Sequence, residues 1–366
     1  MKWINILLII LVITGVNAYG ENDAYIIRQR GFIKLMPLYQ SWSIEGYNDF
    51  SEFSVLEFAY FPLGRNLSMA LRGGQATANG DNLQSLSGVI DTQLSFSYHL
   101  ESAHLVLNLG LNLPSGKKEL NLEEFVTSSL ISNNILNFQV PNFGQGLNVS
   151  PGFTWAVPVS ENFVLGLGAS YQLKDKFKPI KDFSDDYNPG DELLLTGGLD
   201  VRLSKTATFS TDIIFTTFGT DKIGNQEVFA SGNRVVVNGQ FRKYFNFNEL
   251  WLFARYRSRA KSELAVAGQL VPEEKKTNPN QLEFMGHYRI RLSRRFYASI
   301  LVEGRFYQET PAAFSGINLL GGGIAPEIYL SSNFKLPLIF KYLTGSFKNG
   351  PNISGFEIGI GFSIRY

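Results

Sequence analysis

The sequence predicts an all-β fold, specifically a transmembrane antiparallel up-and-down β-barrel, and three observations support this prediction. Segments of strict apolar–polar alternation recur downstream of Phe32, tight turns between them alternate with longer polar loops, and the chain ends on an alternating strand. Alternation with a period of two residues indicates strands. Short turns on one side and long loops on the other are typical of outer-membrane barrels.

The alternation leaves wholly apolar faces. In His104–Leu113 five leucines occupy every second position, and Asn162–Leu173, Glu192–Leu203 and Gln281–Leu292 follow the same pattern. Such faces would need a second sheet to cover them in a soluble β-sandwich, whereas a barrel turns them toward lipid. We therefore favour the barrel over the sandwich.

The turns predict the number of strands. Seven connections are tight: Leu63–Asn66, Leu100–Ala103, Val159–Asn162, Ser204–Thr206, Asn246–Asn248, Ser293–Arg295 and Ser331–Asn333. Each pair of successive tight turns leaves room for one hairpin closed by a longer loop. With both termini on the tight-turn side, eight hairpins give about 16 strands, and 14 remains an alternative because the first hairpins are the least distinct.

The segment Gly355–Tyr366 alternates without a break. Its apolar series runs Phe356, Ile358, Ile360, Phe362, Ile364 and Tyr366. We expect this series to face lipid, with Tyr366 in the interfacial aromatic girdle, and we expect the strand to close the barrel near Phe32. A terminal aromatic residue on such a strand resembles the signature that the barrel-assembly machinery of bacteria recognises.

Composition supports one large β-domain. The chain has 366 residues, 14% aromatic and 18% charged residues, and 35 glycines. Residues 1–18 combine Lys2, a short apolar run and a small-residue cleavage site, which predicts a secretory signal peptide. A short N-terminal segment (19–31) and the barrel (32–366) follow, so we expect an outer-membrane location.

Several functions are disfavoured. The chain has no cysteine, and removal of Lys2 would leave 32 basic against 32 acidic residues, a poor balance for binding nucleic acid. The three histidines lack the neighbours that a metal site needs. Neither a nucleophile elbow nor a spaced catalytic triad stands out, so we expect no enzyme activity and no cofactor.

One loop differs from the rest. After Lys118 the sequence predicts a short helix over Leu122–Ile131, followed by an apolar stretch that contains Phe138 and Phe143. Exposed apolar surface on a loop is costly, so this segment either packs into the barrel mouth or forms a landing site for solutes in which Phe125, Phe138 and Phe143 take part. A structural cap over the rim is the alternative.

Arginines gather late in the chain on positions that the alternation turns inward. They are Arg234, Arg242, Arg255, Arg257, Arg259, Arg289, Arg291 and Arg305, with Glu283, Glu303 and Glu327 on the same face. Guanidinium groups suit bidentate capture of carboxylates. We expect this wall to guide anionic groups, with Arg257 and Arg289 at its centre. The alternative is that neighbouring acidic groups or water neutralise every arginine.

The stretch Gly88–Leu203 carries a family resemblance. "GVIDTQLSFSYHL" with "LVLNLGLNLPSGKKEL" resembles the barrels of the meta-pathway of phenol degradation, and the apolar loop with "YNPGDELLLTGGLDVRL" resembles the wider FadL/TodX-like transporters. The resemblance implies uptake of hydrophobic small molecules across the outer membrane. Those transporters have a substantial N-terminal hatch, whereas only Tyr19–Gly31 precedes the first strand here.

The sequence thus predicts an outer-membrane channel for fatty-acid-type or aromatic-hydrocarbon-type solutes, in contact with membrane lipid and lipopolysaccharide. Two alternatives stay open. A general diffusion porin would carry opposed charges on its constriction loop, and a structural or adhesion barrel would carry larger outer loops.

Overall fold

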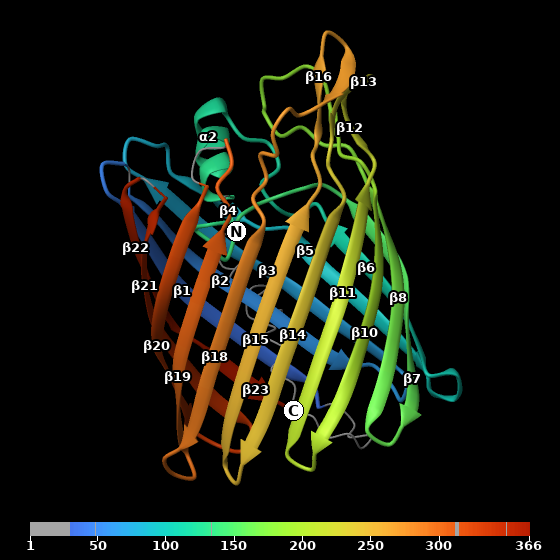
Figure 1. Cartoon of the computed structure of the whole chain (residues 1–366), viewed down its shortest axis with the longest axis vertical. Helices are drawn as coiled ribbons and strands as arrows, with labels where there is room; N and C mark the ends of the chain where they lie inside the picture. The colour runs from blue at the N-terminus through green and yellow to red at the C-terminus, as the bar shows by residue number, and fades with distance from the viewer. Residues whose placement is uncertain (1–29, 48, 133, 312–314, 349) are drawn as a thin grey trace, which may run out of the picture.

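A computed structural model describes residues 30–47, 49–132, 134–311, 315–348 and 350–366. The predicted signal peptide and most of the short segment after it lie outside the described residues. The barrel wall consists of tilted antiparallel strands in a single ring (Figure 1). Its strands are β1 (Phe32–Ile44), β2 (Phe50–Pro62), β3 (Leu67–Gly80), β4 (Leu86–Val89), β5 (Thr92–Leu100), β6 (Leu105–Leu113), β7 (Asn148–Ser160), β8 (Phe163–Lys174), β10 (Glu192–Ser204), β11 (Ala207–Phe218), β14 (Arg234–Phe245), β15 (Asn248–Arg259), β18 (Gln281–Arg291), β19 (Phe296–Tyr307), β20 (Ile317–Tyr329), β21 (Phe334–Phe347), β22 (Asn352–Ile360) and β23 (Phe362–Arg365).

These strands form a closed 16-strand barrel, as the turn pattern predicts. Two wall positions are each shared by two short strands. β4 and β5 both pair with β3, and β22 and β23 both pair with β1. The 14-strand alternative is wrong because the first hairpins, β1–β2 and β3–β5, are continuous with the rest of the wall.

The C-terminal strand closes the barrel against the first strand. Phe32 pairs with Arg365 and Leu38 pairs with Gly359, and the Tyr366 amide donates to the Gly31 carbonyl at 2.9 Å. The even-numbered side chains of this strand are exposed, for example Ile358 at 50%, whereas Glu357 is 3% exposed inside the wall. The predicted closure and the predicted lipid-facing series are confirmed.

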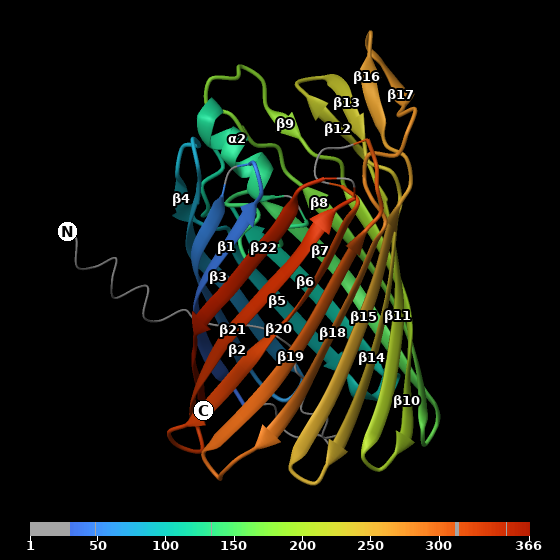
Figure 2. The ribbon, with the colours of Figure 1, turned by 60° about the vertical axis from the view of Figure 1, so that its left-hand side comes forward.

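All seven predicted tight turns lie at one end of the barrel, and the longer loops lie at the other. One tight turn contains the 3-10 turn η1 (Glu101–Ala103). At the loop end a second sheet stands above the rim (Figure 2), built from β9 (Tyr187–Asn188), β12 (Thr220–Ile223), β13 (Gln226–Ala230), β16 (Glu263–Val266) and β17 (Gln269–Pro272). The loop end is the outer side by the barrel convention. This second sheet was not predicted from the sequence.

The predicted helix is present as α2 (Leu122–Ile131). Asn121 caps it: its side chain accepts from the Glu124 amide at 2.7 Å, and Glu124 accepts from the Asn121 amide at 3.3 Å. This reciprocal capping box satisfies two amides that a helix start leaves without partners. In the described part of the chain, no helix is long and apolar enough to cross a membrane.

Candidate functional site

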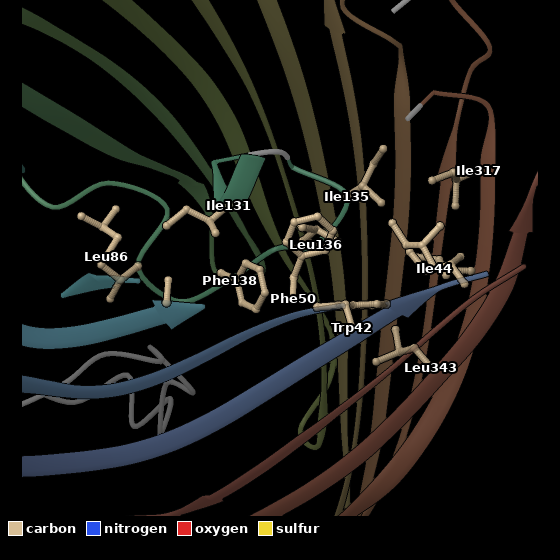
Figure 3. Packing of buried hydrophobic residues seen from close by; sticks show 14 of the residues in the cluster. Trp42, Ile44, Phe50, Leu86, Ile131, Ile135, Leu136, Phe138, Ile317 and Leu343 are labelled. Carbon is tan, nitrogen blue, oxygen red and sulfur yellow. The ribbon is translucent and has the colours of Figure 1, made fainter. Parts of the chain in front are cut away.

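The long loop between β6 and β7 folds inward and packs against the inside of one wall. Its apolar residues meet inward-facing side chains near the outer ends of the wall strands, such as Trp42 and Phe50 (Figure 3). From the loop the cluster takes Leu120, Ile131, Ile135, Leu136, Phe138, Val140 and Phe143. The loop therefore narrows the outer mouth from the side of β1–β3 and β20–β22.

Polar side chains of the wall hold the backbone of the loop. Gln40 Nε2 donates to the Asn137 carbonyl at 3.3 Å, and Gln40 Oε1 accepts from the Gln139 amide at 2.8 Å. Directly opposite Gln40 on the neighbouring strand, Glu52 Oε1 accepts from the Val140 amide at 3.0 Å. Both side chains are almost fully buried. Backbone groups that leave water need such partners, so these contacts fix where the loop runs.

A charge cluster completes the anchor. Arg305 lies 2.6 Å from Glu303 and 3.9 Å from Glu357, while Lys341 lies 3.0 Å from Glu303 and 2.8 Å from Glu357. Arg305 Nη1 donates to the Ile135 carbonyl at 3.2 Å. Two cations and two anions balance here. Arg305 and Glu303, which the sequence suggested as substrate-binding residues, thus join the wall to the loop.

Of the two arrangements that the sequence left open for this loop, Phe138 and Phe143 adopt packing into the barrel mouth. Both are 3% exposed because they pack against the wall. The outer face of α2 is exposed instead, with Leu122, Phe125 and Val126 at 59%, 37% and 43% exposure. Spacings of three and four residues place these three on one side of the helix. The opposite side is buried through Thr127 and Ile131.

The pairing registers confirm that the eight predicted arginines and three glutamates all face inward. For example, Arg234 pairs with Arg259, Val236 with Arg257, and Glu283 with both Arg255 and Arg305. The predicted set omitted the inward carboxylates Glu192, Glu249 and Glu357 and the inward lysines Lys174, Lys335 and Lys341. Extending the same alternation into their strands would have found them.

Arg257 and Arg289 do not form one centre. Arg289 pairs with Glu249, at the tight-turn end of β15, and Glu249 precedes Arg257 by eight residues. At a rise of about 3.3 Å per residue, these levels are about 26 Å apart. The two arginines therefore belong to different regions of the wall.

Near the tight-turn end, two carboxylates and several aromatic groups contact the inward arginines. Arg289 Nη2 lies 2.7 Å from Glu327, donates to the Tyr329 hydroxyl at 2.9 Å, and its guanidinium carbon lies 4.3 Å from the centre of the Tyr297 ring. Arg291 stacks on the Phe247 ring at 4.5 Å. Arg242 pairs with Glu249 at 3.2 Å. These arginines form a structural ladder across neighbouring strands.

The arginines near the outer mouth have different interaction partners. Arg257 donates to the neutral Gln281 side chain at 2.9 Å, and Arg255 lies 3.8 Å from Glu283. Guanidinium groups of Arg234 and Arg259 both lie over the Phe218 ring. These arginines and Phe218 lie on β11, β14 and β15, and Gln281 and Glu283 lie on β18.

Outside the membrane-spanning strands, Glu273 organises the loop between β15 and β18. Its carboxylate accepts from the Ser262 and Thr277 amides at 3.0 Å each and from the Thr277 hydroxyl at 2.7 Å. Burial alone would raise the pKa of Glu273, but these hydrogen bonds outweigh it and hold the pKa below its ordinary value.

No family model matches the chain, and no curated protein matches it in sequence. Among solved structures, CdiB from Acinetobacter baumannii matches with a TM-score of 0.52 and 10% identity, covering 91% of this chain and 60% of CdiB. The chain therefore spans about 60% of that protein's length. This likeness and the closed, lipid-facing wall show the fold. The chain is an outer-membrane β-barrel.

Two further structures give lower scores. A Pseudomonas aeruginosa FadL homologue matches with a TM-score of 0.47 and 8% identity, covering 92% of this chain and 90% of that one. The CymD monoaromatic hydrocarbon channel matches with a TM-score of 0.46 and 10% identity, covering 97% and 94%. The substrate of this outer-membrane barrel has to be argued from its own residues.

Proposed function

We propose that this barrel is a passive channel through which hydrophobic or amphipathic small molecules cross the outer membrane. Barrels of 16 strands enclose a lumen wide enough for a solute path, and here the inward loop occupies part of it. A solute would land on the outer rim, pass the loop and move along the polar wall. No catalytic step and no cofactor enter this proposal.

The exposed apolar face of α2 supports the proposal that the solutes are hydrophobic. This face is defined by Leu122, Phe125 and Val126. The helix stands at the outer rim with its other face packed into the barrel (Figure 1). Apolar side chains on one face of an anchored helix offer a landing surface for apolar solutes. The loop's apolar contacts with the wall also favour this proposal over a general porin, whose constriction loop would present opposed charges.

The test measures entry of N-phenylnaphthylamine, a neutral hydrophobic dye that fluoresces in membranes, into intact Gram-negative host cells that express the protein. We expect faster entry than in cells without it. Replacement of Leu122, Phe125 and Val126 by Ser should lower the rate by about tenfold while the protein stays folded in the outer membrane.

A matched control replaces three equally exposed apolar residues on the other outer structure, the β16–β17 hairpin. These are Leu264, Val266 and Val271, which are 48%, 58% and 43% exposed. This variant should keep the wild-type rate. Dye entry that is no faster than in cells without the protein would overturn the proposed function.

A further inference from the structure

The outer mouth of the lumen carries an uncompensated group of cations opposite the inward loop. Strand order around the ring places β14 eight positions from β2, so the wall of β11, β14 and β15 faces the wall against which the loop packs. Arg234 and Arg259 pair directly across β14 and β15, and Arg257 lies one inward position deeper. Like charges directly opposite each other on strands are unfavourable, so this arrangement calls for a compensating partner.

Charge compensation from the described residues is small. Glu192 lies 2.6 Å from Lys174 and 3.9 Å from Arg234, so one carboxylate serves two cations. Within the described residues, neither Arg257 nor Arg259 forms an ion pair with a carboxylate. Four cations thus meet one anion at this level. The next level inward, with Arg255 and Glu283 at 3.8 Å, is balanced.

The guanidinium groups are held in place rather than free to move. Two of them lie over the Phe218 ring, with the guanidinium carbons of Arg234 and Arg259 at 5.3 and 5.2 Å from its centre. Gln281 accepts a hydrogen bond from Arg257 at 2.9 Å. The Nε of Arg234 is buried with no hydrogen-bond partner among the described residues. Fixed guanidinium donors reduce the entropy lost when an anion binds.

Apolar side chains lie beside the arginines on the same inward face. Val236 pairs with both Arg257 and Ile214, and Leu194 pairs with Thr216, the partner of Arg234. A solute with a carboxylate at one end and an apolar body would find complementary groups side by side. A small inorganic anion would use only the arginines.

We infer that Arg234, Arg257 and Arg259, ordered by Phe218, form a binding site for the carboxylate of an amphipathic solute whose apolar part lies on Leu194, Ile214 and Val236. This inference rests on the proposed channel function and names its substrate class as organic carboxylates. The charge-assisted hydrogen bonds supply the affinity for the head group. The apolar patch selects carboxylates with a hydrophobic body.

The test is isothermal titration of the purified full-length barrel, in a non-ionic detergent, with 3-phenylpropanoate and with its neutral analogue 3-phenylpropanol. We expect wild type to bind the carboxylate at least about tenfold more tightly than the alcohol. The double variant Arg257→Gln with Arg259→Gln should lose that preference. The control variant, Arg255→Gln with Glu283→Gln, removes a charge pair from the next level without changing net charge and should keep it.

Equal binding of the acid and the alcohol by wild type, or an unchanged preference in the arginine variant, would overturn the inference. Acetate tested alongside separates a bare anion site from the proposed one, because acetate binding as tight as that of 3-phenylpropanoate would contradict the apolar patch. Dye entry is measured on the same variants. Normal dye entry without carboxylate preference would refute only this inference, whereas absent dye entry in wild type would refute the channel itself.

Discussion

Glu52 on β2 holds the inward loop through Val140, whose amide donates to the Glu52 carboxylate at 3.0 Å across a sequence separation of 88 residues. Both groups are buried, so neither can exchange its partner for water without cost. We expect Glu52→Leu to release the loop from the wall while the barrel stays closed.

Limited proteolysis from the outside measures this release. The wild-type segment 134–147 should resist cleavage, and Glu52→Leu should be cut there several-fold faster. The control is Glu57→Gln, on the same strand but on the outward-facing series. Equal protection of Glu52→Leu and wild type would show that this contact does not hold the loop.

The two classes of phenylalanine on the loop should behave differently. Phe138→Ser removes a fully packed ring, and the loss of such a core side chain costs about 3–5 kcal/mol. We expect it to loosen the loop in the same proteolysis assay. Phe125→Ser should leave proteolysis unchanged and reduce dye entry, because its side chain is 37% exposed. Identical outcomes for the two variants would contradict the division into a packed side and a landing side.

Arg305→Met should destabilise the barrel strongly. It leaves Glu303 and Glu357 facing Lys341 alone in a buried site, and breaking a buried pair from one side costs about 3–5 kcal/mol. Urea unfolding in lipid vesicles measures the change. The double variant Arg305→Met with Glu303→Leu should cost less than Arg305→Met, because it leaves the Lys341–Glu357 pair balanced. An exposed pair, Lys348–Glu309, serves as the control, and Lys348→Met should change stability by less than about 1 kcal/mol.

The loop between β15 and β18 should loosen in acid. Because hydrogen bonds hold the folded-state pKa of Glu273 below its unfolded value, the stabilisation is present above the unfolded pKa and is lost as pH falls through the folded pKa. Hydrogen exchange of residues 260–280, corrected for intrinsic rates, should show protection at pH 7 that declines below about pH 4. Glu273→Gln should show reduced protection at pH 7 and little further change in acid. A pH-independent wild-type loop would contradict this role.

The barrel could be predicted because the sequence features that specify it lie within single strands and turns. Alternation, turn length and the C-terminal series determine strand number, closure and the direction of each side chain, so the inward position of Arg257 and Arg289 followed from their strands. The start of α2 was equally readable, since Asn121 and Glu124 form a capping box in the sequence.

The candidate site was less predictable because it depends on long-range contacts. Alternation gives the face of Arg257 and Arg289 but not their heights in the wall, which depend on strand register and shear. The burial of Phe138 likewise depends on Trp42 and Phe50, nearly a hundred residues earlier. The second outer sheet forms by strand pairing between separate loops, such as Phe229 with Leu264. The sequence of one loop alone does not predict such pairing.

If this barrel is a channel narrowed by the loop between β6 and β7, removal of the loop should widen it. Single-channel conductance in planar bilayers measures this, with wild type compared against a variant in which a short Gly-Ser linker replaces residues 121–146. We expect small conductance steps for wild type and steps several-fold larger for the variant, with both proteins showing the same heat-dependent gel shift of a closed barrel. Equal conductance of the two folded proteins, or none from either, would contradict it.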